Sequence, residues 1–316
     1  MFHVKHLSAG KSPRRLELSE GACAMSNDDA TPLATELMDL TRRREALAKR
    51  VAPLPVNTRI VALSNQKGGV GKTTTTVNVA AALARLGARV IVIDLDPQGN
   101  ASTALGIDHH AKIPGIYEVL LGSSSVQSVL QQSPGNENLW CVPATINLAG
   151  AEIELVPASA RETRLKRALE EYLASADVSP HYIFIDCPPS LGLLTVNALT
   201  AATEVFVPIQ AEYYALEGVT MLWDNIAMVQ RFLNPRVSIS GVLLTMYDHR
   251  TNLSREVADE VRRHFPDIVF KSVIPRSVRV SEAPSFQQTV IDYDHDSVGS
   301  IAYREAAIEF AERGVY

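Results

Sequence analysis

Residues 60–74 of the chain read IVALSNQKGGVGKTT. An apolar run leads into a glycine-rich turn and then into residues suited to a helix, which is the strand, loop and helix order of a phosphate-binding P-loop. Glycines at positions 68, 69 and 71 let the backbone curl, so that its N–H groups point into one concavity beside the positive end of the following helix. The stretch therefore predicts a polyphosphate site.

Two lysines in this stretch have different expected roles. Lys72 is expected to neutralise the β- and γ-phosphates of a nucleotide, and the Thr73 hydroxyl is placed to bind Mg²⁺. The usual P-loop has glycine six residues before its lysine, whereas this chain has Gln66 there, followed by a second lysine, Lys67. The predicted nucleotide-binding residues are Lys67, Gly68, Gly69, Val70, Gly71, Lys72, Thr73 and Thr74.

Carboxylates follow two of the expected buried strands. Asp94 and Asp96 end one apolar run and Asp186 ends another, at the strand ends where open α/β sheets bind ligands. Asp186 is the expected partner of nucleotide-bound Mg²⁺, and Asp94 is expected to adjust the metal or its loop. Asp96 is the better candidate for orienting an attacking water. The alternative is that these carboxylates only cap helices or close turns.

From residue 59 onward, short apolar runs alternate with helical patterns. This order predicts an α/β fold with a doubly wound, mostly parallel sheet and helices on both faces. The expected strands are residues 60–64, 89–94, 139–142, 182–186, 204–209, 240–246 and 269–274. The expected helices are residues 73–86, 160–174, 216–232, 254–264 and 298–313.

One folded domain preceded by an extension is expected. Residues 1–57 are rich in Ser, Gly, Pro and mixed charges, which is typical of a flexible extension, and residues 58–316 form the expected nucleotide-binding domain. One amphipathic helix is expected inside the extension, because Thr31 can cap it and Pro32 suits its first turn.

Composition limits the classes of protein that fit. With 46% apolar and 21% charged residues and no apolar run long enough for a bilayer, we expect a soluble, cytoplasmic protein that is not bound to a membrane. Three cysteines without CxxC spacing support neither a disulfide framework nor a zinc site. The net charge is −5, so nucleic-acid binding needs a local patch, and residues 249–279 carry seven basic against four acidic residues.

A set of motifs in a fixed order resembles the ParA/Soj chromosome-partition ATPases of the MinD/ParA superfamily, which have deviant Walker A motifs. The resemblance covers about residue 59 to the end of the chain. Beside the P-loop, it rests on DLDPQGN at 94–100, LAGAEIEL at 148–155, DCPPSLG at 186–192, EYYALEG at 212–218 and SEAPS at 281–285.

The resemblance implies a homodimer that ATP and Mg²⁺ hold together. Lys67 would reach across a nucleotide-sandwich dimer to the phosphates bound by the other subunit, and Gly68 would stay small for this approach. ATP hydrolysis to ADP and phosphate would be slow and would release monomers. The catalytic residues implied are Asp96 and Lys67, and a ParB-type centromere-binding protein would stimulate the reaction.

The same resemblance implies that the ATP dimer binds DNA without sequence preference and associates with the nucleoid. The matching arginines are Arg250 and Arg279, both within the basic stretch. Pro275 and Arg276 would border the adenine.

Two alternatives belong to other classes of function. A MinD-like membrane positioner would need a basic amphipathic helix at the end of the chain, and residues 302–316 carry three glutamates against two arginines. A nucleotide-dependent scaffold without turnover is the other alternative, and the presence of Asp96 argues against it.

Overall fold

The computed structural model describes residues 31–212 and 217–314, and the chain divides into two units, Met1–Thr41 and Arg42–Tyr316. The described residues of the first unit belong to helix α1 (Pro32–Ala48), which continues into the second unit. The helix begins where the sequence predicts it, because the Thr31 hydroxyl accepts a hydrogen bond from the Ala34 backbone N–H at 3.3 Å. The remaining elements all lie in the second unit.

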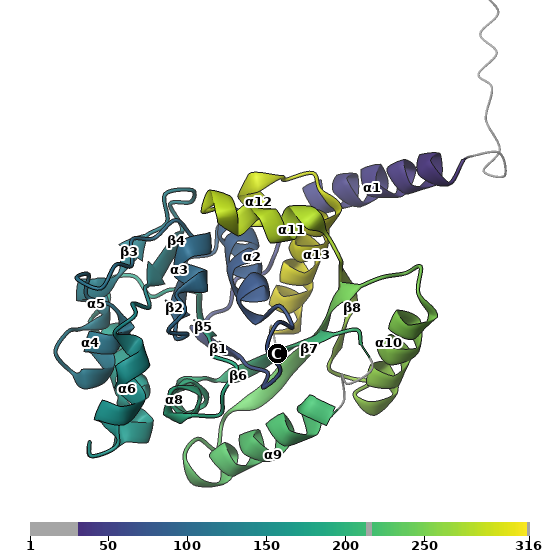
Figure 1. Cartoon of the computed structure of the whole chain (residues 1–316). Helices are drawn as coiled ribbons and strands as arrows, with labels where there is room; N and C mark the ends of the chain where they lie inside the picture. Colours follow the sequence, from purple (N-terminus) through teal and green to yellow (C-terminus); the bar gives the residue numbers. More distant parts are fainter. Residues whose placement is uncertain (1–30, 213–216, 315–316) are drawn as a thin grey trace, which may run out of the picture. The chain divides into compact units, whose positions relative to one another are not determined.

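One sheet organises the second unit (Figure 1). In the described part of the chain it has eight strands in the order β3-β4-β2-β5-β1-β6-β7-β8. All neighbours pair in parallel except β3 and β4, which are antiparallel. The strands are β1 (Arg59–Leu63), β2 (Val90–Asp94), β3 (Gln131–Gln132), β4 (Leu139–Val142), β5 (Tyr182–Asp186), β6 (Glu204–Gln210), β7 (Ser238–Tyr247) and β8 (Val269–Pro275).

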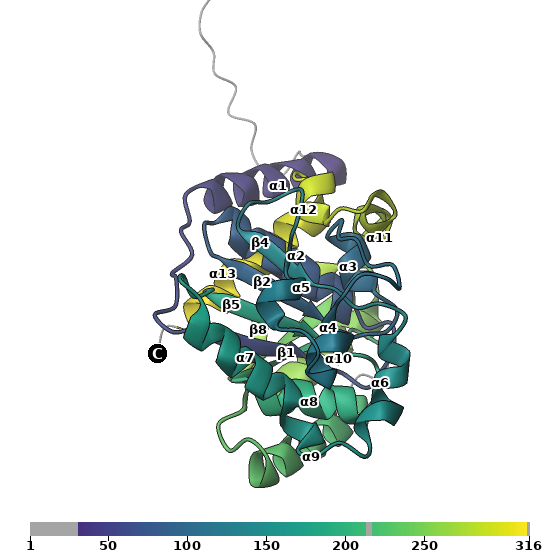
Figure 2. The ribbon, with the colours of Figure 1, turned by 90° about the vertical axis from the view of Figure 1, so that its left-hand side faces the viewer.

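Helices cover both faces of this sheet. Figures 1 and 2 place α2 and α13 on one side of the sheet and α8 and α9 on the other. The helices are α2 (Lys72–Arg85), α3 (Asn100–Ala104), α4 (Ile116–Leu121), α5 (Val126–Val129), α6 (Leu148–Leu155), α7 (Arg164–Ser175), α8 (Leu193–Ala201), α9 (Glu217–Phe232), α10 (Asn252–His264), α11 (Val278–Glu282), α12 (Val290–Tyr293) and α13 (Val298–Arg313), with 3₁₀ turns η2 (Arg161–Thr163) and η3 (Ala283–Phe286). The predicted fold class is confirmed.

The predicted elements agree with the structure to within a few residues. Strands 139–142 and 182–186 and helix 298–313 have the predicted bounds. The helix predicted from residue 160 begins at Arg164, because the residues before it form the 3₁₀ turn η2. The predicted start of another helix at residue 216 lies outside the described residues. The prediction lacked β3 and the short helices α3, α4, α5, α6, α8, α11 and α12.

A buried arginine fastens the amino-terminal edge of the sheet. Arg59, which begins β1, forms two hydrogen bonds of 2.7 Å with the Glu204 carboxylate at the start of β6. Its third nitrogen donates to the Phe310 carbonyl oxygen of α13 at 3.0 Å, and the guanidinium lies over the Phe310 ring. A Cβ atom on Gly314 would lie 2.1 Å from this guanidinium, so the end of α13 must approach without a side chain. One cation therefore joins β1, β6 and α13.

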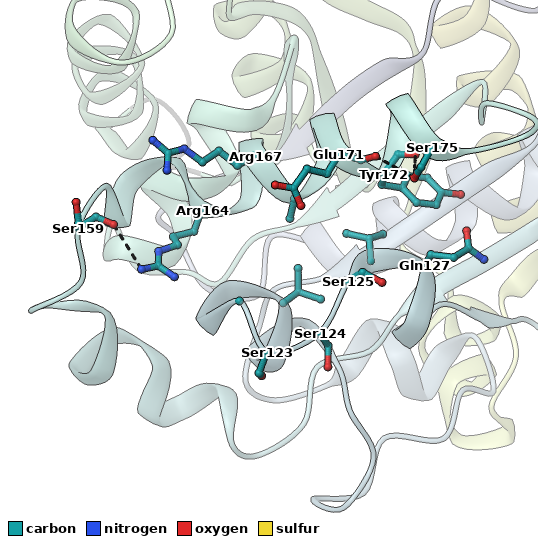
Figure 3. Close-up of a pocket in the computed structure, with 14 residues that line it drawn as sticks. Ser123, Ser124, Ser125, Gln127, Ser159, Arg164, Arg167, Glu171, Tyr172 and Ser175 are labelled. Carbon is teal, nitrogen blue, oxygen red and sulfur yellow. Dashed lines mark hydrogen bonds between the residues drawn. The ribbon is translucent and has the colours of Figure 1, made fainter.

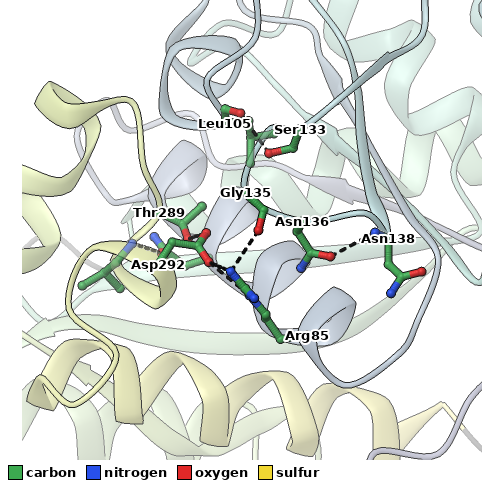
Figure 4. Close-up of polar contacts among 10 residues, drawn as sticks. Arg85, Leu105, Ser133, Gly135, Asn136, Asn138, Thr289 and Asp292 are labelled. Carbon is green, nitrogen blue, oxygen red and sulfur yellow. Dashed lines mark hydrogen bonds and ion pairs between the residues drawn. The ribbon is translucent and has the colours of Figure 1, made fainter.

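A second polar junction ties α2 to α12 (Figure 4). Arg85, the last residue of α2, donates at 2.6 Å to the Asp292 carboxylate of α12 and at 2.9 Å to the Gly135 carbonyl oxygen. Two turns earlier on α2, the buried Asn78 accepts a 2.7 Å hydrogen bond from the Val290 backbone N–H at the start of α12. The helix that follows the P-loop thus holds α12 at both ends.

We expect Arg59→Met to lower the free energy of unfolding by about 3 kcal/mol, because it leaves the Glu204 carboxylate largely buried without its cation. The double variant Arg59→Met, Glu204→Met is expected to recover much of this loss, since no charge remains there. Urea denaturation measures both values. Arg262→Met, which removes an exposed ion pair with Asp259, is the matched control and should change the value by less than about 1 kcal/mol. A single variant as stable as the wild type would contradict the assignment.

Candidate nucleotide site and basic surface

The P-loop is hydrogen-bonded to two strands of the sheet, β6 and β7. The Asn65 side chain donates to the Pro208 carbonyl oxygen of β6 at 2.8 Å and accepts from the Lys67 backbone N–H at 3.0 Å. The Thr245 hydroxyl of β7 donates to the Val70 carbonyl oxygen at 2.8 Å. Gly71 precedes α2 with a φ of 86°, a conformation that a side chain would strain. The next two strands on one side of β1, β6 and β7, therefore fix the curvature of the loop.

The two lysines of the loop lie in different surroundings. Lys72 is 7% exposed, and its Nζ donates to the Lys67 carbonyl oxygen at 3.3 Å, inside the loop. Burial lowers the pKa of Lys72, and the Asp186 carboxylate opposes part of this shift. The side chain of Lys67 is 36% exposed, and its Nζ lies 3.7 Å from the Glu212 carboxylate, which also lies 3.6 Å from Arg276. Lys72 thus serves its own loop, whereas Lys67 points to the rim.

Asp186 lies at the centre of the site. Its two carboxylate oxygens accept hydrogen bonds from the hydroxyls of Thr73 at 2.7 Å and Thr76 at 2.9 Å, one turn apart on α2. The side chain is fully buried at the end of β5. A threonine hydroxyl beside a strand-end carboxylate is the donor set that P-loop proteins use for nucleotide-bound Mg²⁺. The predicted Thr73 and Asp186 are thus in direct contact.

Asp94 fixes the loop that carries Asp96. One Asp94 oxygen accepts hydrogen bonds from the backbone N–H of Ser102 at 2.8 Å and from its hydroxyl at 2.7 Å. The other oxygen accepts from the Asp96 backbone N–H at 3.3 Å. Asp96 in turn accepts from the Gln98 backbone N–H at 3.0 Å, which shapes the turn before α3. The contacts of Asp94 favour the loop-adjusting role over direct metal binding.

Two buried carboxylates face one another across neighbouring strands. Asp94 of β2 and Asp186 of β5 are partners in the parallel register. Burial raises the pKa of Asp94 to about 7, and the negative charge of Asp186 adds to the shift. Burial also raises the pKa of Asp186 to about 6, although the hydroxyls of Thr73 and Thr76 oppose this shift. A cation bound here would relieve both shifts.

The loop also has room and unused polar groups for a nucleotide. A Cβ atom on Gly68 or Gly69 would meet no atom within 4 Å. The side-chain Nε2 of Gln66 is buried without a hydrogen-bond partner among the described residues. An open glycine cradle, the buried Lys72 and an orphaned amide together fit a polyphosphate ligand.

The predicted DNA-binding arginines lie outside this site. Arg250 follows β7, its side chain is 77% exposed, and both of its hydrogen bonds to the Asp248 carboxylate measure 2.9 Å. Arg279, on α11, pairs with Glu282 at 3.2 Å and with Asp294 at 3.4 Å. Both guanidinium groups are exposed, and each is balanced by a local carboxylate. The positive potential of this surface is therefore weaker than the count of basic residues indicates.

Several residues that complete the site are not among the predicted site residues. Thr76 could have been inferred, because it follows Thr73 by three residues and therefore shares its helix face. Ser102, Thr245 and Glu212 act through contacts made by the folded chain, and no local pattern marks them.

The buried carboxylates of Asp94 and Asp186 are predicted to make the free energy of unfolding depend on pH. Because the folded pKa of Asp94 lies above the ordinary value of 3.8, the folded state retains a proton that the unfolded state loses. The free energy of unfolding therefore falls as the pH rises from about 4 to about 7. Asp94→Asn keeps an acceptor for Ser102 and removes this loss.

We expect the stability of Asp94→Asn relative to the wild type to increase by about 1 to 2 kcal/mol between pH 5 and pH 7.5. Urea denaturation without nucleotide and with a chelator measures the difference. Asp177→Asn alters an exposed carboxylate and serves as the control. An equal pH dependence in wild type and Asp94→Asn would show that the carboxylate pair is not strained.

A glycine-rich loop between a strand and a helix, with carboxylates at the ends of two neighbouring strands, forms a P-loop nucleotide-binding site. This geometry identifies the chain as a P-loop nucleotide-binding protein. A family model described as AAA domain matches residues 58–239. The chain is 52% identical to the sporulation initiation inhibitor protein Soj of Bacillus subtilis, over 81% of this chain and 99% of the relative. It is 51% identical to the chromosome partitioning protein ParA of Caulobacter vibrioides, over 81% and 94% of the two chains.

Solved structures share the fold of this chain. A Mycobacterium smegmatis protein described as cobyrinic acid a,c-diamide synthase, with bound ATP analogue and magnesium, has a TM-score of 0.68 and 42% identity, covering 79% of this chain and 93% of that one. The septum site-determining protein MinD of Pyrococcus horikoshii has a TM-score of 0.62 at 23% identity, over 81% and 95% of the two chains, and shows the shared fold. The chain belongs to the Soj/ParA family of chromosome-partitioning ATPases.

Proposed function

We propose that this chain is an ATP-dependent switch for DNA segregation. ATP and Mg²⁺ hold two copies in a sandwich dimer, the dimer binds nucleoid DNA without sequence preference, and a ParB-type centromere-binding protein stimulates the hydrolysis that releases it. The membership of the Soj/ParA family and the nucleotide site support the proposal.

The orientation of Lys67 is the observation that carries the proposal. A P-loop needs one lysine for its own phosphates, and the buried Lys72 fills that position. Lys67 extends to the rim of the site, where Glu212 is its ion-pair partner. Crowding two sets of phosphates at a two-fold interface calls for cations from both sides, and Lys67 is placed to supply one.

The space above the loop supports the same arrangement. Within one chain, a side chain at Gly68 would meet open space, so nothing in the monomer requires glycine there. The close approach of a second subunit supplies such a requirement.

Each predicted site residue has a role in this proposal. Thr73 and Asp186 hold Mg²⁺, directly or through water, and Asp94 keeps the neighbouring loop in place. The metal, when bound, neutralises charge on the phosphates. Asp96 orients the attacking water, and Lys67 of each subunit stabilises the charge on the phosphates of the other. Pro275, the last residue of β8, and Arg276, the residue after it, border the adenine.

We expect Lys67→Ala to bind ATP as a monomer but to lose the dimer and the stimulated release of phosphate, because its contacts lie between subunits. Light scattering with a non-hydrolysable ATP analogue measures the dimer, and steady-state phosphate release with DNA and the partner measures turnover. Lys112→Ala changes an exposed lysine outside the loop and should leave both unchanged. A dimer of normal stability in Lys67→Ala would overturn the role across the interface.

We expect Arg250→Glu and Arg279→Glu each to abolish DNA retention while ATP binding remains. The dimer binds DNA through two weak phosphate-binding patches, one on each subunit, that act together. Because each charge reversal alters the patch of both subunits, DNA retention is lost. Retention on immobilised DNA at low salt is the measurement. Arg236→Glu makes the same charge change before β7, at the other end of that strand, and should retain DNA. Full retention by the Arg250 and Arg279 variants would refute this surface.

The structure also bears on the two alternatives. Among the described residues, no helix combines the length and apolar character needed to cross a bilayer. The apolar side chains of α13, such as Ile301, Ile308 and Phe310, are buried in the core, so the helix has no apolar face to offer a lipid surface as a MinD-like positioner would. A scaffold without turnover would bind ATP and DNA but show no stimulated phosphate release, which the assay above detects.

A further inference from the structure

A groove separate from the nucleotide site lies between α7 and the turn that joins α4 to α5 (Figure 3). Its volume is about 860 Å³. One wall is formed by α7, including Arg164, Arg167 and Glu171, and the other by the three consecutive serines at 123–125. None of these residues belongs to the nucleotide site or to the proposed DNA-binding surface.

The charges along α7 run against its dipole. Its first turn contains Arg164, Lys166 and Arg167 and no acidic residue, whereas Glu170 and Glu171 follow further along. Cations at the amino-terminal end of a helix oppose the positive end of the dipole, so this order does not serve the stability of the helix. Of these cations, Arg164 and Arg167 line the groove and place positive charge at one end of it.

The two arginines of the groove differ in what they already bind. Arg164 donates to the carbonyl oxygens of Leu120, Leu121 and Ser159, and these contacts hold it in place. The exposed side chain of Arg167 makes no hydrogen bond or ion pair with any described residue. A fixed cation beside an unpaired one can receive a carboxylate at no loss of existing contacts.

The floor of the groove is apolar. Val119, Val126 and Tyr172 line it and are almost fully buried. The hydroxyl groups of Ser124 and Ser125 at the rim add hydrogen-bond donors, whereas the Ser175 hydroxyl on the other side already donates to the backbone of α7. The groove therefore suits a ligand with an apolar centre and acidic flanks.

We propose that this groove binds an acidic segment of a partner protein, in which an apolar residue enters the groove and neighbouring Asp or Glu side chains pair with Arg164 and Arg167. Glu171, one turn beyond Arg167 on α7, repels a carboxylate and a phosphate alike, so the acidic side chains are expected at the Arg164 end of the groove. DNA fits less well because four strands separate β4, on whose side of the sheet the groove lies, from β7, which precedes Arg250.

The test uses the full-length protein and a fluorescein-labelled peptide of Glu-Glu-Leu repeats, followed by fluorescence anisotropy at low salt. We expect Arg167→Glu to weaken peptide binding by about tenfold, because an attractive charge becomes repulsive. Ser124→Glu, which places a negative charge on the opposite wall, should also weaken it. A Lys-Lys-Leu peptide should not bind.

Lys166→Glu is the matched control. It makes the same charge change one residue away on the same helix, but Lys166 lines a different cavity beside Leu169 and Leu173. This variant should bind the peptide within about twofold of the wild type. ATP turnover and DNA retention should be unchanged in all three variants, so the outcome is independent of the proposed partition function.

Three results would overturn the proposal. The first is that the wild type does not bind the acidic peptide, and the second is that Lys166→Glu loses as much affinity as Arg167→Glu, which would indicate unspecific attraction. The third is a loss of DNA retention in Arg167→Glu, which would assign the groove to DNA instead.

Discussion

The structure depends on the contact between α2 and the buried carboxylate of Asp186, the last residue of β5. Two threonine hydroxyls from one face of α2 meet its two oxygens, and Asp94 lies beside it on the neighbouring strand. Burial away from bulk water is the main cause of the raised pKa values of both carboxylates, and the negative charge of Asp186 adds to the shift of Asp94. Lys72 compensates only in part, because it is itself partly desolvated. The folded chain thus contains a site that is electrostatically incomplete without a cation.

Helix α2 relates this site to distant parts of the chain. Its first two turns supply Thr73 and Thr76, and its last residue, Arg85, holds α12 through Asp292. Asp294, directly after α12, is an ion-pair partner of Arg279. Helix α2 therefore connects the nucleotide loop to the segment that carries Asp294. The carboxylate of Asp294 pairs with Arg279, a predicted DNA-binding residue. The nucleotide loop and Arg279, which lies on α11, are thus linked through α2, α12 and Asp294.

The sequence predicted the strands of the sheet better than its short helices. Strands β2 and β5 are continuous runs of Val, Ile and Phe that end in aspartate, a pattern with few other interpretations. Helix α8 is buried on most sides, so it lacks the polar face from which helical periodicity is recognised. Helices α3, α5 and α12 have too few residues for any periodicity. The P-loop and its carboxylates followed from local motifs, whereas Glu212 and Ser102 depend on how the folded chain brings separate segments together.

The antiparallel strand β3 has a consequence for assembly. It consists of two glutamines, and it covers the outer side of β4 at one end of the sheet. A long, flat edge strand would offer many unpaired backbone groups to another chain. A strand as short and polar as β3 offers few such groups for pairing. The side-by-side joining of sheets from different copies into filaments is thereby discouraged at this edge.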